Sequence, residues 1–78
     1  MSRAVYVTYE EAQKLQPVFR RLREEAPWKE ARESASRLLG ELSLVKKGVD
    51  YELGGKQVLL EPIDYEFLMD VITQLDLR

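Results

Sequence analysis

The chain contains no histidine, no cysteine and no asparagine. Histidine is the commonest general base of enzymes, and cysteine supplies the usual thiol nucleophile. Both are also the main ligands of structural zinc. Their absence excludes disulfides and Cys/His zinc sites, and it removes the usual residues of nucleophilic catalysis. We therefore predict a protein that is not an enzyme and that uses no cofactor.

Serine offers another nucleophile, and the serines at positions 34, 36 and 43 are the candidates considered. A serine needs a base to accept its proton, and with histidine absent that base would have to be a lysine. No pattern in the sequence places a lysine beside one of these serines. We therefore predict no catalytic role for these serines.

Long apolar runs are also missing, since none approaches the roughly 18 residues of a membrane-spanning helix. Residues 1–7 are short and interrupted by Arg3, which does not match a secretory signal peptide. We therefore expect a cytoplasmic protein without membrane contact. Seven arginines and no Asn or Cys form a composition typical of thermophilic proteins.

What remains is a chain of 78 residues that is 45% apolar and 33% charged, as expected for a folded domain. Its length predicts a single domain over residues 1–78. A domain of this size buries only about 60% of its unfolded surface, and its core contributes about 3–5 kcal/mol. Pairing with a second copy is a common source of further stability, so we expect a homodimer.

Charge is divided unevenly along the chain. Residues 1–49 hold ten Lys/Arg and seven Asp/Glu, whereas residues 50–78 hold two Lys/Arg and seven Asp/Glu. The first part is therefore basic and the second acidic. Such a protomer can pair with another copy through opposite charges, either head to tail or antiparallel.

The first half predicts a strand and a helix. Arg3–Val7 is rich in β-forming residues. Thr8, followed three residues later by Glu11, fits the capping box and predicts a helix from Tyr9. The apolar face of that helix is Ala12, Leu15, Phe19 and Leu22. Pro17 lies inside the pattern and predicts a kink or a break into two short helices.

A second helix follows Pro27, which suits the first helical position. Apolar residues alternate there at spacings of three and four, giving a heptad-like stripe. The stripe is Trp28, Ala31, Ala35, Leu38, Leu42 and Val45. Lys46 and Lys47 would occupy the last turn, and Gly48 would cap the helix. We expect Trp28 to be only partly buried and to pack on the core.

Gly54-Gly55 predicts a β-hairpin between Val49–Leu53 and Lys56–Leu60. The alternation places Tyr51, Val58 and Leu60 on the face that packs on helices, with Leu59 on the other face.

A final helix follows Pro62, with Asp64 as its expected N-cap and Ile63 stapled onto Leu68. Its apolar face is Phe67, Leu68, Val71, Ile72 and Leu75. The order of strand, two helices, hairpin and helix predicts an α+β fold.

Candidate contact residues come from both charged parts. Glu66 and Asp70 share a helix face because they are four residues apart. No loop with closely spaced oxygen ligands accompanies them, so no metal site is predicted. Polar-tipped aromatic residues such as Trp28 are enriched at protein interfaces. The predicted protein-binding residues are Arg20, Arg21, Arg23, Trp28, Glu66 and Asp70.

The first functional hypothesis is a small protein-interaction or regulatory module that forms a homodimer. The width of the apolar stripe and the divided charge favour it. The competing explanation is internal, with the arginines at 20, 21 and 23 paired to Glu66 and Asp70 of the same chain.

Two other functions stay open. The element order matches a winged helix, and Arg3–Glu11 resembles in outline the opening of the ribbon-helix-helix family, over less than half of the chain. That resemblance implies a DNA-binding regulator whose strand pairs with its copy. The third hypothesis is an inhibitor whose acidic C-terminal third covers a basic site on a partner.

Overall fold

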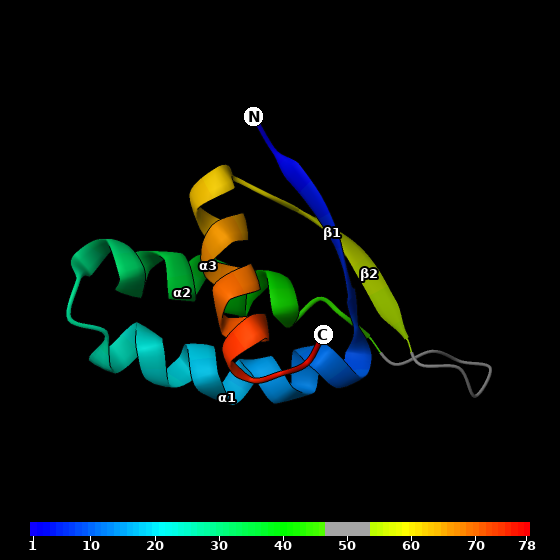
Figure 1. Ribbon diagram of the computed structural model, residues 1–78, viewed down its shortest axis with the longest axis horizontal. Coiled ribbons are helices and arrows are strands. Elements are labelled where there is room, and N and C mark those ends of the chain that lie inside the picture. Colours follow the sequence, from blue (N-terminus) through cyan, green and yellow to red (C-terminus); the bar gives the residue numbers. More distant parts are fainter. Residues whose placement is uncertain (47–53) are drawn as a thin grey trace.

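The computed structural model describes residues 1–46 and 54–78 (Figure 1). Its elements are β1 (Arg3–Thr8), α1 (Tyr9–Glu25), α2 (Lys29–Leu42), β2 (Gly55–Leu60) and α3 (Pro62–Gln74). Figure 1 shows α1 and α2 as a helical hairpin, with α3 crossing it and the two strands beside α3. The α+β prediction is confirmed. Within the described ranges, no helix has the length and hydropathy needed to cross a membrane.

The two strands form an antiparallel pair in which Val5 lies opposite Val58. Val5 and Val7 are buried on the face toward the helices together with Val58 and Leu60, while Leu59 is exposed on the outer face. The predicted alternation of the second strand is therefore confirmed. Its predicted hairpin partner, residues 49–53 with Tyr51, lies outside the described residues, as does Gly48.

Pairing between β1 and β2 was not predicted, because no turn joins strands so far apart in sequence. It also means that the strand expected to pair with its copy in a ribbon-helix-helix arrangement is paired within the chain. A Cβ atom at Gly55 would meet the end of the Tyr6 ring, so a larger residue there would have to displace that exposed side chain.

α1 begins with the predicted capping box. The Glu11 amide donates to Thr8 Oγ1 over 3.1 Å, and the Thr8 amide donates to Glu11 Oε1 over 3.0 Å. Of the two alternatives predicted at Pro17, the break is wrong, because α1 runs through it as one helix of 17 residues. Pro17 is exposed, while Leu15 and Phe19 on either side are fully buried. Their burial stabilises the helix on both sides of Pro17 despite the hydrogen bond that proline removes.

α2 confirms the inner part of the stripe, since Ala35, Leu38 and Leu42 are buried. The helix ends at Leu42, earlier than predicted, and Lys46 therefore lies beyond its last turn. Val45 still enters the core, through a turn in which its amide donates to the Leu42 carbonyl. A turn thus takes the place of the last helical repeat.

α3 begins at Pro62, so Glu61 is the N-cap and the prediction for Asp64 is wrong. Because the helix starts three residues earlier than predicted, Asp64 falls inside it and is buried, while Ile63 is 59% exposed. The predicted staple of Ile63 onto Leu68 is therefore also wrong. Leu68 is buried as predicted, together with Val71 and Ile72.

The core joins all five elements. The buried ring of Phe19 from α1 and the partly buried ring of Phe67 from α3 meet edge to face, with centroids 5.5 Å apart and planes at 84°. Such a pair contributes about 0.5–1.5 kcal/mol beyond its buried area. It fixes how closely α3 approaches the helical hairpin.

Arg78 joins the C-terminal segment to the start of α1. Its guanidinium contacts the Glu11 carboxylate at 2.8 Å and donates to the Tyr6 carbonyl oxygen. The hydrogen bond from Arg78 is the main cause that lowers the pKa of Glu11 from 4.5 to about 2; the Thr8 amide adds to it and burial opposes it.

We predict that Leu38→Ala or Leu42→Ala lowers the free energy of unfolding by about 2–5 kcal/mol, because each removes a fully buried side chain and leaves a cavity. Urea denaturation followed by circular dichroism measures the loss. Leu44→Ala, at a side chain that is 51% exposed, is the matched control and should change stability little. Equal losses in all three variants would contradict the assigned core.

Acid should weaken the fold through Glu11. Its pKa is depressed in the folded state, so its contribution is complete above the ordinary value of 4.5 and is lost as the pH falls toward about 2. The urea midpoint of the wild type should therefore drop between about pH 5 and pH 2. Glu11→Gln should start lower and drop less, whereas the exposed Glu10→Gln should follow the wild type. Parallel curves for all three proteins would exclude this role.

Candidate functional site

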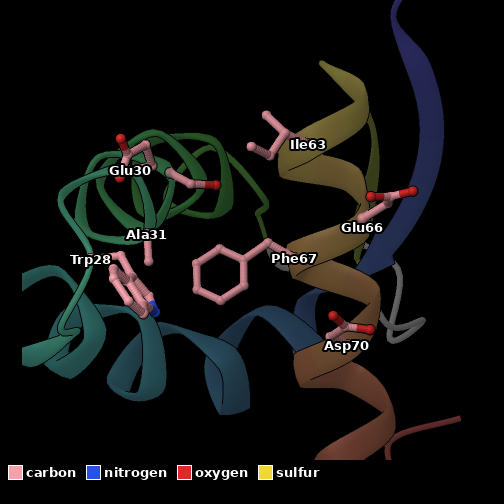
Figure 2. Close-up of a pocket in the computed structure, with 8 residues that line it drawn as sticks. Trp28, Glu30, Ala31, Ile63, Glu66, Phe67 and Asp70 are labelled. Carbon is pink, nitrogen blue, oxygen red and sulfur yellow. The ribbon is translucent and has the colours of Figure 1, made fainter.

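A groove lies between α2 and α3, with a volume of about 370 Å³. Figure 2 shows its two walls, one from the first turns of α2 and the other from α3. Its lining residues are Trp28, Glu30, Ala31, Ser34, Ile63, Glu66, Phe67 and Asp70. The α2–α3 groove therefore contains Trp28, Glu66 and Asp70, three of the six residues predicted to make contacts.

The apolar part of the groove is built around two aromatic rings. Phe67 points from α3 toward α2, and Trp28 lies across from it at the start of α2 (Figure 2). Trp28 is 70% exposed, so the prediction that it packs on the core is wrong. The reason is the helix boundary: α2 begins at Lys29, and Trp28 precedes it with an extended backbone. Its side chain therefore leaves the buried stripe and stands at the groove.

The charged part of the groove is entirely acidic. Glu30, Glu66 and Asp70 are exposed, and none forms an ion pair with another residue in the described ranges. Among the residues that the structure describes, no lysine or arginine lines the groove. A positively charged group entering it would meet three carboxylates beside an aromatic ring.

Asp64 holds the two walls together. It is 3% exposed, and it accepts a hydrogen bond from the Ser34 hydroxyl over 2.6 Å and from Arg37 Nε over 2.8 Å. The bond from Arg37 is the main cause that lowers the pKa of Asp64, with Ser34 adding to it and burial opposing it. The same contact raises the pKa of Arg37. A buried, charged carboxylate on α3 is thus held by two residues of α2.

This contact was not predicted, because Asp64 matches the pattern of a helix N-cap. The signal available was the spacing of Ser34 and Arg37, which are three apart and so share a helix face. Nothing in the sequence indicated that their partner lies on the last helix.

The three predicted arginines lie elsewhere. Arg20, Arg21 and Arg23 are exposed near the end of α1, beside Pro17. Arg21 contacts Glu25 at 3.7 Å, and Arg23 contacts Glu24 at 3.7 Å. In the part of the chain that the structure describes, none of the three pairs with Glu66 or Asp70. The internal pairing considered from the sequence is therefore not found there.

Among residues 1–46 and 54–78, no group of three or more acidic side chains is arranged to hold a metal ion. Comparisons of the chain with protein-family models, curated proteins and solved structures found no match.

Removing Asp64 should destabilise the fold and loosen the groove. Asp64→Ala leaves the buried Ser34 hydroxyl without its acceptor, at a cost of about 1–3 kcal/mol. Asp70→Ala, which removes an exposed carboxylate from the same helix, is the control and should be nearly neutral. A double-mutant cycle with Ser34→Ala, followed by urea denaturation, measures the coupling. Additive losses would show that the two side chains do not act together.

Proposed function

We propose that the protein is a small, non-enzymatic protein-interaction module with a regulatory role, that it forms a homodimer, and that the α2–α3 groove is its contact surface. The observation that carries the proposal is the exposure of Trp28 beside Phe67 and Ala31 in that groove. A tryptophan left in water forgoes the burial of a large apolar area, which contact with a partner would supply.

The composition of the groove supports a contact surface. Tryptophan is among the residues most enriched at the centres of protein interfaces, where it contributes a large share of the binding energy. Ile63 adds a second exposed apolar side chain on the facing wall. The three carboxylates around them supply a polar rim, so the groove has the anatomy of an interface.

The polar chemistry of the groove supports a role without catalysis. The candidate nucleophile among the described lining residues is the Ser34 hydroxyl, which donates a hydrogen bond to Asp64. A carboxylate whose pKa is lowered by an arginine is a poor base, because it has little tendency to take up that proton. The other polar side-chain groups among the described lining residues are the Trp28 indole N–H and three carboxylates exposed to water.

A second candidate is the acidic inhibitor, and the same groove favours it. Glu66 and Asp70, which were predicted to cover a partner's basic site, stand there together with Glu30. Opposite charges of this kind steer partners toward each other and increase the association rate. The inhibitor differs from the first proposal in its partner, which would be a basic protein and not a second copy.

Trp28→Ala should weaken self-association at least tenfold, because it removes the aromatic ring at the groove. Sedimentation equilibrium over a range of concentrations measures the dimer dissociation constant. Leu59→Ala, which removes an exposed side chain from the sheet, is the control and should leave the constant unchanged. The chain has one tryptophan, so a blue shift of its emission with concentration gives an independent signal.

Two results would contradict this proposal. A wild-type chain that stays monomeric at every concentration would exclude the homodimer. A dimer whose constant does not change in Trp28→Ala would place the interface elsewhere on the surface.

A further inference from the structure

We propose that the occupant of the α2–α3 groove is the arginine-bearing end of α1 from a second copy of the chain. This end, here called the arginine ridge, consists of Arg20, Arg21 and Arg23 with Pro17, Val18 and Leu22 beside them. The inference rests on the proposed function, because it names what fills the groove in the homodimer.

Charge complementarity is the first support. The groove presents three carboxylates that are unpaired among the described residues, and the ridge presents three guanidinium groups with Glu24 and Glu25 beside them. The local partners of Arg21 and Arg23 are exposed glutamates at 3.7 Å, and such surface pairs contribute about 0–1 kcal/mol. The ridge therefore gives up little when it exchanges these partners for the groove. Pairs shielded from water by Trp28 and Phe67 would be stronger than exposed ones.

Apolar complementarity is the second support. Pro17, Val18 and Leu22 line a depression beside Arg21, where Val18 and Leu22 are half-buried against the core. The ridge is therefore an amphipathic helical segment, which is the kind of ligand that an apolar groove with a charged rim accepts. The face of Trp28 can also receive a guanidinium group by a cation–π contact. Arg3 makes such a contact within the chain, 4.1 Å from the centre of the Tyr65 ring.

Geometry within one chain is the third support. The ridge lies on α1 and lines different depressions from the α2–α3 groove, and the described residues contain no ion pair between the two. The complementary surfaces of one copy therefore stay apart and are available to another. In a two-fold dimer each ridge enters the groove of the other copy, so the contact forms twice and the assembly is closed.

Charge exchange tests this arrangement directly. A groove variant carries Glu66→Arg and Asp70→Arg, and a ridge variant carries Arg20→Glu and Arg21→Glu. Each variant alone should dimerise at least tenfold more weakly than the wild type, because like charges then face each other. An equimolar mixture should form a heterodimer, since one interface is restored with reversed signs and the other is the native one. Sedimentation velocity with one variant fluorescently labelled detects it.

The control exchanges the same charges away from the groove. Glu10→Arg with Glu33→Arg, at two exposed positions outside the groove lining, should dimerise as the wild type does. Circular dichroism checks that all variants are folded.

The wild-type dimer should also weaken between about 0.05 and 0.5 M salt, because screening lengths shorten from roughly 14 to 4 Å over that range.

The outcomes separate this inference from the function on which it rests. A dimer that is lost in Trp28→Ala but survives in both charge variants would overturn the arginine ridge and leave the groove as the interface. A mixture that fails to form the heterodimer would overturn it as well. Assemblies that grow steadily with concentration would overturn the closed two-fold arrangement. A wild-type chain that never associates would overturn both proposals.

Discussion

The structure depends on one buried carboxylate. Asp64 is charged, almost inaccessible to water, and bound by Ser34 and Arg37 of another helix. Burying a charge is costly unless hydrogen bonds replace its hydration, and here three hydrogen bonds from Ser34 and Arg37 of α2 do so. Because these bonds are directional, they fix where α3 crosses α2. The groove between the two helices, and the direction in which Phe67 points into it, follow from that crossing.

A core this small is held by polar contacts at its margins as well as by apolar packing. Glu11 joins the capping box of α1 to Arg78, which also binds the Tyr6 carbonyl oxygen of β1. The Gln16 side chain donates to the carbonyl of Leu42, where α2 ends. Each contact satisfies a backbone or carboxylate group that the short elements would otherwise leave to water. Strand β1 is thereby joined both to the start of α1 and to the C-terminal residue Arg78.

Local rules predicted the elements well and the long-range contacts poorly. The capping box at Thr8, the inner stripe of α2 and the alternation at Val58 and Leu60 were readable because each depends on neighbouring residues. The pairing of β1 with β2 and the role of Asp64 were not, since both join parts of the chain that share no local signal. At Pro17 tertiary packing outweighed a local preference. Of the predicted contact residues, the structure gathers Trp28, Glu66 and Asp70 but leaves the arginines on α1.

The wrong predictions at Trp28 and Ile63 have one cause and one location. Trp28 was expected to pack on the core and Ile63 to pack on Leu68, and each is kept from that contact by the point where its helix starts. α2 starts just after Trp28, and α3 starts just before Ile63, so both side chains are released from the core to the same groove. A sequence optimised only for its own stability would bury them. Local rules fail mainly where function competes with folding, and here they fail on both walls of the site that we propose binds a partner.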